Sequence, residues 1–507
     1  MPVQQRYIEI MDTTLRDGEQ TSGVSFSPSE KLTIAQVLLT EVKVDRIEIA
    51  SARVSEGELA AVKAITKWAK TNGLLNKVEV LTFVDGDVSV QWMLQAGAKV
   101  MNLLTKGSLN HLTHQLKKKP AEHFADVAEV IALARKKGLD CNVYLEDWSN
   151  GMRHSRDYVY QYLDFLQHQP VKRVMLPDTL GVLTPGEVQE YISEIVQRYP
   201  QMHVDFHAHN DYDLGTANVL EGVKAGAHGI HLTVNGMGER AGNAPLASAI
   251  AVLNDFLPGV KTAVSEKSLY SASKLVETFS GIRIPANKPV VGDNVFTQTA
   301  GIHADGDKKN KLYFSDLMPE RFGRQRLYAL GKTSGKANIE NNLHQLGIQL
   351  SDANLKKVTQ RIIELGDKKE VVTQADLPYI ISDILDSSRI EEKVKIENYV
   401  LTHSKNLHPS VTLRISVEGE LFEEHSQGDG QYDAFMNALK KVYKKKKREL
   451  PALTDYSVHI PPGGKSDALC ETIITWSFQN KEFKTRGLDS DQTVSAIKAT
   501  QKMLNLI

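Results

Sequence analysis

Two histidines separated by a single residue are the clearest candidate for metal chemistry in this sequence. His207 and His209 stand at the end of a predicted strand, and because side chains alternate along a strand, both imidazoles are expected to face the same side of the sheet. Alone, such a pair is more often a hydrogen-bonded structural pair than a metal site. Two oxygen donors change this balance, because Asp17 follows the first predicted strand and Asn243 follows the last. Together these side chains suit Zn²⁺, Mn²⁺ or another divalent ion, with coordination positions left open for a substrate.

Other polar residues stand at or just after predicted strand ends, and each has two interpretations. Arg16 is adjacent to Asp17 and could reach an oxyanion or a carboxylate, but a structural salt bridge accounts for it equally well. Glu146 shares a face with Tyr144, and its alternative role is an ion pair with a lysine. The loop 235–243 (NGMGERAGN) could bring backbone close to a phosphorylated ligand, but glycines in so short a loop also form ordinary turns.

Short β-branched runs alternate with longer amphipathic stretches through the first half of the chain, which predicts an α/β fold with a closed (β/α)8 TIM barrel. The predicted strands are 7–11, 46–50, 78–84, 99–104, 139–145, 173–176, 203–207 and 229–234. Two helix starts are marked by a cap, a proline and a glutamate, at 27–30 and 184–187. Barrels of this kind carry their catalytic groups at the carboxyl ends of the strands, where the polar residues above are placed.

Two further regions are predicted after the barrel. Residues 1–275 form the catalytic barrel, and 276–392 form a linker made of an extended arm and then a helical subdomain. Residues 393–507 form an α+β regulatory domain in which a unit of three strands and a helix occurs twice, near 394–443 and 454–505. The cluster of positive charge at 440–448 is interpreted as a solvated helix end rather than a polyanion site.

Composition limits the class of partner. The 507 residues carry 61 Lys and Arg against 62 Asp and Glu, and 41% are hydrophobic, which excludes disordered and collagen-like classes and argues against nucleic acid or a membrane surface as partner. The two cysteines, Cys141 and Cys470, cannot build a disulfide framework. No stretch approaches the roughly 20 apolar residues of a membrane span, and we recognise no targeting segment. We therefore expect a cytoplasmic protein that acts on small molecules.

Several motifs together resemble the DRE-type TIM-barrel metallolyase superfamily. They are 12–20 (DTTLRDGEQ), 207–210 (HAHN) and the glycine-rich loop 235–243. The segment 301–306 (GIHADG) and the duplicated C-terminal domain are similar to its branch of 2-isopropylmalate, homocitrate and citramalate synthases. The resemblance covers nearly the whole chain. It implies an acyltransferase that condenses acetyl-CoA, as an enolate, with a 2-oxoacid bound on Zn²⁺, Mn²⁺ or Mg²⁺, followed by thioester hydrolysis.

The resemblance also implies a role for each candidate residue. Arg16 would stabilise the forming alkoxide or enolate, Thr179 would hold the oxoacid carboxylate, and Glu146 would orient the substrate or assist proton transfer. The implied metal ligands are Asp17, His207, His209 and Asn243. His303 and Tyr313 resemble the acid/base and CoA-proximal residues, and Asp305 a substrate-binding residue; the group that deprotonates acetyl-CoA stays open. The arm that carries them would come from a partner subunit, which implies a homodimer with shared active sites, and the C-terminal domain would bind a branched-chain amino acid effector.

The choice of 2-oxoacid is a question of size. Leu81, Leu104 and Tyr144 lie near one rim of the predicted barrel; each could be plain barrel packing, but together they resemble the apolar wall of the pyruvate-using citramalate synthases. An isopropyl group would overpack such a wall at a cost of about 1–3 kcal/mol. The sequence therefore favours pyruvate, with (R)-citramalate as the product on a route to isoleucine, and 2-oxoisovalerate, with 2-isopropylmalate and leucine, as the alternative.

Two other classes compete with this interpretation. A lyase or aldolase on the same barrel is disfavoured by the C-terminal domain, which the superfamily's lyases lack in this combination. A catalytically silent metal-binding regulator is disfavoured because Arg16, Asp17 and Glu146 are all present together with both histidines.

Overall fold

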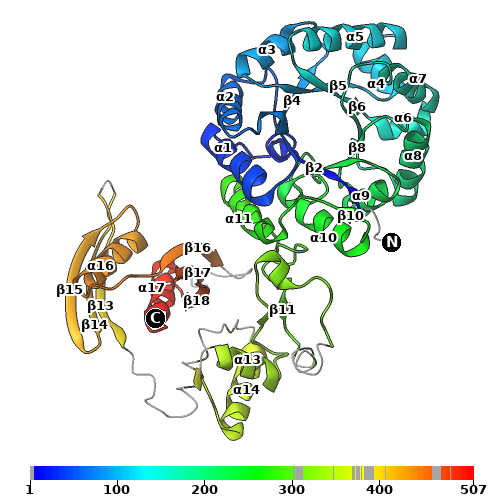
Figure 1. Cartoon of the computed structure of the whole chain (residues 1–507). Coiled ribbons are helices and arrows are strands. Elements are labelled where there is room, and N and C mark those ends of the chain that lie inside the picture. The colour runs from blue at the N-terminus through cyan, green and yellow to red at the C-terminus, as the bar shows by residue number, and fades with distance from the viewer. Residues whose placement is uncertain are drawn as a thin grey trace. The chain divides into compact units, whose positions relative to one another are not determined.

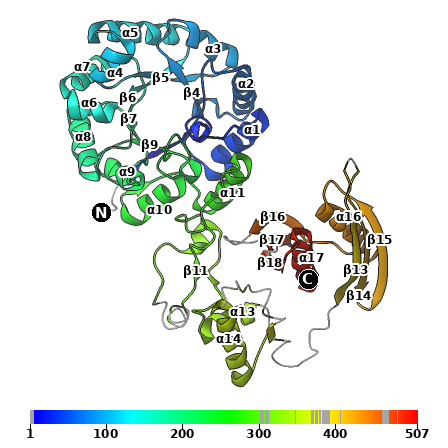
Figure 2. The same ribbon diagram turned by 180° about the vertical axis from the view of Figure 1, so that it is seen from behind.

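The computed structural model describes residues 5–300, 303, 306, 312–345, 348–367, 372, 377, 380–381, 393–405, 407–459, 470–479 and 481–506. It contains two compact units. The first comprises Met1–Phe296 with Ser315–Gln325, and the second comprises Thr297–Phe314 with Arg326–Ile507. Figures 1 and 2 show the barrel of the first unit from opposite sides.

Eight parallel strands close into a barrel, which confirms the predicted α/β fold. In barrel order they are β2 (Glu9–Asp12), β3 (Arg46–Ser51), β4 (Val78–Phe83), β5 (Val100–Lys106), β6 (Asp140–Glu146), β7 (Val174–Asp178), β8 (Val204–Ala208) and β9 (Gly229–Leu232). The barrel closes between β2 and β9, where Glu9 pairs with Gly229 and Asp12 with Leu232. The loop after β2 therefore lies near the ends of β8 and β9, although it is far from them in sequence.

One predicted strand differs from the structure. The run 7–11 is divided between two strands, because β1 (Arg6–Tyr7) pairs with β10 (Val260–Lys261) outside the barrel and the barrel strand begins only at Glu9. The physical reason is that the backbone N–H groups of Arg6 and Ile8 bond carbonyls of the 259–261 segment. The apolar pattern of the sequence continues from β1 into β2, so it does not show where pairing with β10 ends and pairing within the barrel begins.

Helices surround the barrel strands (Figures 1 and 2). They are α1 (Pro28–Val37), α2 (Glu56–Thr71), α3 (Val88–Ala96), α4 (Leu109–His111), α5 (Pro120–Lys136), α6 (Trp148–His154), α7 (Arg156–Leu166), α8 (Pro185–Arg198), α9 (Gly215–Lys224), α10 (Leu246–Phe256) and α11 (Leu269–Ser280). Both predicted capping boxes are confirmed. The Ser27 hydroxyl accepts the Glu30 N–H and the Glu30 carboxylate accepts the Ser27 N–H, and Thr184 and Glu187 repeat the pattern in α8.

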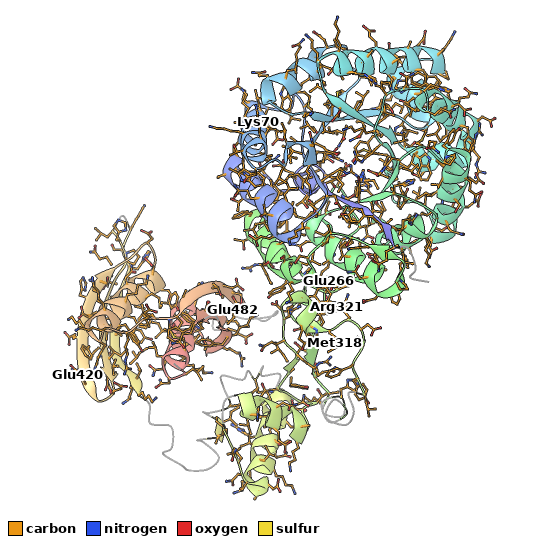
Figure 3. All side chains as sticks on the ribbon, in the orientation of Figure 1. Lys70, Glu266, Met318, Arg321, Glu420 and Glu482 are labelled. Carbon is orange, nitrogen blue, oxygen red and sulfur yellow. The ribbon has the colours of Figure 1, made fainter. Side chains whose placement is uncertain are left out.

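Side chains fill the inside of the barrel, as Figure 3 shows, and near the amino ends of the strands they are charged. Arg46 bonds Asp205 at 2.6 Å and Glu79 at 3.2 Å, and all three are at most 3% exposed. Asn142 bonds both Glu79 and Asn102, at 3.3 and 2.8 Å. Buried charges persist only when they are paired and hydrogen-bonded, so this network restricts how these strands can be arranged.

A segment that follows the barrel in sequence returns to pack on it. The helical turn η7 (Pro319–Phe322) carries Arg321, whose guanidinium bonds Glu266 at 2.6 Å and Asp255 at 2.7 Å (Glu266 and Arg321 are labelled in Figure 3). The adjacent Phe322 is buried in the main hydrophobic core. Residues 315–325 are therefore part of the barrel unit.

The second unit contains a helical part and a duplicated α+β part. The helical part includes the two-stranded sheet of β11 (Thr297–Gln298) and β12 (Leu327–Tyr328), and α13 (Lys336–Gln345) and α14 (Asp352–Asp367), whose buried faces share one apolar cluster. The predicted duplication is confirmed. Its first copy is β13 (Val394–Thr402), β14 (Ser410–Val417), β15 (Glu420–Gln427) and α16 (Gln431–Lys445), and its second is β16 (Ala452–His459), β17 (Cys470–Phe478), β18 (Lys481–Asp489) and α17 (Gln492–Leu504). Each copy is an antiparallel three-stranded sheet followed by its helix.

Within the described residues, the structure contains no helix with the length and apolar character that crossing a membrane requires.

The buried charge network predicts an unequal effect of two similar substitutions. Arg46→Met should lower the free energy of unfolding by about 3–5 kcal/mol, because it leaves Asp205 and Glu79 buried beside an apolar side chain. Lys172→Met, which removes the exposed pair with Asp140, should change it by less than about 1 kcal/mol. Urea denaturation of the full chain measures both, and equal effects would contradict the assigned role of the network.

Candidate active site

Asp17, His207 and His209 form a buried cluster at the carboxyl ends of the barrel strands. The Nε2 atoms of His207 and His209 lie 3.3 and 3.8 Å from Asp17 Oδ2, and one ligand atom of each residue lies within 4.8 Å of the others. His207 belongs to β8 and His209 follows it, whereas Asp17 comes from the loop after β2. Barrel closure thus brings together groups that are about 190 residues apart in sequence.

The protonation states of these three side chains depend on their burial and on the charges of their neighbours. Burial alone would raise the pKa of Asp17, but Arg16 and the two histidines hold it well below its usual range, so the carboxylate is ionised. Burial lowers the pKa of His209 to about 4 and also lowers that of His207. Both imidazoles are therefore neutral near pH 7, which is the form that binds metals.

Asn243 and Gly238 complete the cluster from the loop after β9. Asn243 lies beside His209 in an isolated backbone bridge, and its Nδ2 donates to the Met237 carbonyl at 3.0 Å, which leaves its Oδ1 free. Gly238 has φ +150°, and a Cβ there would lie 2.2 Å from Asn243 Nδ2 and 3.2 Å from Asp17 Oδ1. A glycine is required at this position because the backbone passes directly against the cluster.

The donor set fits a divalent metal ion. Among the described residues, the buried Oδ1 atoms of Asp17 and Asn243 have no hydrogen-bond partner, and an unpaired buried polar atom costs free energy unless something else binds it. Two neutral imidazoles with a carboxylate and an amide oxygen are ligands that Zn²⁺ and Mn²⁺ accept. The cluster could therefore hold such an ion.

Arg16 joins the cluster to the inside of the barrel. Its Nη1 lies 3.1 Å from Asp17 Oδ2 and its Nε bonds Glu48, so it forms structural salt bridges and also lies at the candidate site. Burial lowers the pKa of Arg16, but Glu48 and Asp17 outweigh this effect and raise it above its usual value. Glu48 is held in turn by the Asn102 amide at 2.7 Å. The guanidinium is a permanent, rigidly placed positive charge.

Leu81, Leu104 and Tyr144 lie together inside the barrel. They form one apolar cluster with Met11 and Met175. The Tyr144 ring stands edge-on to the His207 ring, with centroids 6.2 Å apart. The predicted wall and the candidate metal ligand His207 are therefore neighbours.

Glu146 and Thr179 lie at the rim, and each has a partner. Glu146 forms an ion pair with Lys106, the arrangement that the sequence left as its alternative role. The Thr179 hydroxyl oxygen accepts the backbone N–H of Asp147 at 2.9 Å. Asp147 is held in a left-handed conformation, φ 63°, while its carboxylate accepts the Ser108 hydroxyl at 2.7 Å. Because Thr179 already accepts this bond, its hydroxyl hydrogen remains available to an acceptor such as a substrate carboxylate.

The remaining predicted residues belong to the second unit. The rings of His303 and Tyr313 are 4.2 Å apart between centroids. Asp305 lies outside the described residues. The roles of all three stay predictions.

Three further candidate residues lie inside the strands and not at the strand ends where catalytic groups of such barrels are expected. Glu48, Asp205 and His231 are buried within strands: Glu48 bonds Arg16, His231 bonds Tyr144, and Asp205 reaches the site only through His231. A signal was present: Asp205 stands two residues before His207, and a strand places such residues on one face. Ionisable residues spaced by two inside an otherwise apolar barrel strand therefore indicate side chains that face the inside of the barrel.

Three family models match successive segments that together cover most of the chain. Residues 7–276 match the family described as HMGL-like, 290–370 match the homocitrate synthase post-HMGL domain-like family, and 371–507 match the LeuA allosteric (dimerisation) domain.

Individual relatives match over nearly their full length. The chain is 34% identical over 507 residues to a putative (R)-citramalate synthase of Archaeoglobus fulgidus, covering 99% of each protein. It is 33% identical to the (R)-citramalate synthase of Methanocaldococcus jannaschii, again covering 99% of each. It is 32% identical to the 2-isopropylmalate synthase of the same organism, covering 99% of this chain and 94% of the relative. Sequence identity therefore does not separate these two activities.

The cluster predicts that metal is retained only while Asp17 is present. Asp17→Ala should weaken divalent-metal binding by more than about 100-fold, because even residues that only support a ligand typically contribute about 10–100-fold. Metal content after dialysis and titration with Zn²⁺ or Mn²⁺ measures this. Glu239→Gln, an exposed carboxylate in the same loop as Asn243, is the matched control and should bind as the native chain does. Equal metal content in the two variants would contradict the assignment.

Proposed function

We propose that this chain, which belongs to the branch of the HMGL-like family that contains the citramalate and 2-isopropylmalate synthases, condenses acetyl-CoA with pyruvate to give (R)-citramalate and CoA. The relatives named citramalate synthase and 2-isopropylmalate synthase are transferases that use acetyl-CoA. The observation that carries the choice of pyruvate is the packing of Leu81, Leu104 and Tyr144 beside His207. The proposal divides the chain into a catalytic barrel (1–275), a linker (276–392) and a regulatory domain (393–507).

The reaction requires stabilised negative charge. A thioester α-proton is a very weak acid near pH 7, so the site must stabilise the developing enolate and alkoxide and position a base. A divalent ion held by Asp17, His207 and His209, with Asn243 as a further ligand, would polarise the oxoacid carbonyl as a Lewis acid. Arg16 is fixed by Glu48 and Asp17 and remains charged. In this proposal its guanidinium stabilises the forming oxyanion.

Other residues of the chain position the substrates. Thr179 donates its free hydroxyl hydrogen to the oxoacid carboxylate, since its oxygen is already bonded to the Asp147 N–H. Glu146, held at the rim by Lys106, orients the substrate or assists proton transfer. His303 and Tyr313 supply acid/base and CoA-proximal groups from a partner subunit, and Asp305 contacts substrate in the same segment. The match of 371–507 to a dimerisation domain supports a homodimer with shared sites.

The bulky wall distinguishes pyruvate from 2-oxoisovalerate. The methyl group of pyruvate fits beside a cluster of two leucines and a tyrosine, whereas an isopropyl group would have to displace close-packed atoms. Since the two types of relative are almost equally similar to this chain, the wall carries the distinction. 2-Isopropylmalate synthesis is the alternative.

Feedback regulation by isoleucine is part of the proposal. The C-terminal region matches an allosteric domain, and it contains an open cavity of about 870 Å³ between α16 and the segment before β16. Tyr432, Met436 and Leu450 give this cavity an apolar side. Its charged lining is two acidic and four basic residues: Asp433, Glu449, Lys440, Lys444, Lys447 and Arg448. An amino acid with an apolar side chain presents matching groups.

The first test is CoA-thiol release by the metal-loaded protein with acetyl-CoA and each oxoacid. The expected kcat/KM is at least about tenfold higher for pyruvate than for 2-oxoisovalerate, and Leu81→Ala should reduce this ratio by opening the wall. A preference for 2-oxoisovalerate would establish the alternative. No release with either oxoacid would overturn the proposed function.

Regulation is tested in the same assay. Isoleucine should lower the rate with pyruvate, and leucine at equal concentration should do so much less, because the effector is the end product of the route that begins with citramalate. Stronger inhibition by leucine would contradict the assignment of effector.

A further inference from the structure

Tyr144 ends a chain of buried side chains from three barrel strands. Its hydroxyl oxygen lies 3.0 Å from Nδ1 of His231, and Nε2 of His231 lies 3.1 Å from Oδ2 of Asp205. The three residues come from β6, β9 and β8, and none is more than 2% exposed. The proposed reaction assigns no role to His231 or Asp205.

The direction of each hydrogen bond follows from the chemistry of the partners. A carboxylate that is paired with a guanidinium accepts hydrogen bonds, and Oδ2 of Asp205 lies 2.6 Å from Nη2 of Arg46. Nε2 of His231 therefore carries the hydrogen. In a neutral imidazole the other nitrogen is then an acceptor, so the Tyr144 hydroxyl donates to Nδ1.

The chain is anchored at its inner end. Arg46 bonds the same Oδ2 of Asp205 at 2.6 Å and also bonds Glu79. His231 is therefore fixed on one side by a rigid ionic network and on the other side holds a ring that forms part of the oxoacid wall. A tyrosine ring that is hydrogen-bonded at its tip has less freedom to tilt than one held by packing alone.

We propose that His231 and Asp205 are positioning residues for substrate specificity: through the Tyr144 hydroxyl they fix the wall at the depth that admits a methyl group and rejects larger ones. This inference rests on the proposed function, because it assigns the wall to the oxoacid. It differs from a purely steric role for Tyr144 in one respect. A steric wall needs only the ring, whereas a positioned wall needs the hydroxyl and its acceptor.

Tyr144→Phe separates the two roles, because it keeps the ring and removes only the oxygen. We expect kcat/KM for 2-oxoisovalerate relative to pyruvate to rise about tenfold, mainly through a higher KM for pyruvate. His231→Gln should raise the ratio similarly, and the double variant should raise it no further than either single variant, because both remove the same interaction. Asp205→Asn, of nearly the same shape, provides a second way to disturb His231 if His231→Gln fails to fold.

Tyr158→Phe is the matched control. The Tyr158 hydroxyl is also buried and donates a hydrogen bond, to the Lys106 carbonyl at 2.7 Å, but it comes from α7. It should lose a comparable amount of stability and leave the substrate ratio unchanged. A ratio unchanged in Tyr144→Phe, equal ratios in Tyr144→Phe and Tyr158→Phe, or fully additive effects of Tyr144→Phe and His231→Gln would each overturn the inference.

An NMR measurement that does not depend on catalysis tests the hydrogen bond independently of the proposed function. In the full chain labelled with ¹⁵N-histidine, one unprotonated Nδ1 resonance should shift in Tyr144→Phe and not in Tyr158→Phe. If the native protein releases no CoA, the proposed function fails while this spectrum still tests the hydrogen bond. A histidine spectrum that is unchanged by Tyr144→Phe would overturn the inference in either case.

Discussion

The ion pair between Arg16 and Glu48 is the interaction that links the mouth of the barrel to its interior. Glu48 is fully buried in β3 and is stable there as a carboxylate only because a guanidinium and the Asn102 amide satisfy it. Arg16 in turn lies against Asp17, and Asp17 lies against the two histidines. The geometry of the candidate metal site is therefore set by electrostatic balance within the strands and not by the loop alone.

Buried charges are also paired near the amino ends of the strands. Arg46, Glu79 and Asp205 form a second buried group of charges, and His231 joins it to Tyr144. Asn102 and Asn142 join the two groups of charges, and Tyr144 of the apolar cluster contacts both, through His231 and through Arg16. In the proposed function, an oxoacid bound beside this cluster would meet metal ligands on one side and an apolar wall on the other, and this combination orients a small anion and limits the size of its side chain.

The duplicated domain is stabilised mainly by apolar packing and not by buried charges. Each copy buries one face of an antiparallel sheet under its own helix, and the two copies share an apolar core that includes Phe435 and Trp476. Contacts such as Tyr432 Oη to Thr500 Oγ1, at 2.7 Å, join the two copies. The alternation of apolar and polar residues that predicted these strands arises because only one face of each sheet is covered.

The sequence by itself determined the features that depend on neighbours along the chain. Strand alternation, the capping boxes at Ser27 and Thr184, and the common face of His207 and His209 are local, so periodicity and residue type were sufficient. Only the tertiary structure decided that Glu146 pairs with Lys106 and that Tyr144 meets His231, 87 residues away. These partners depend on how the barrel closes. The first barrel strand was predicted to begin at residue 7 and begins at Glu9 for the same reason, because an apolar run does not show which strand will pair with it.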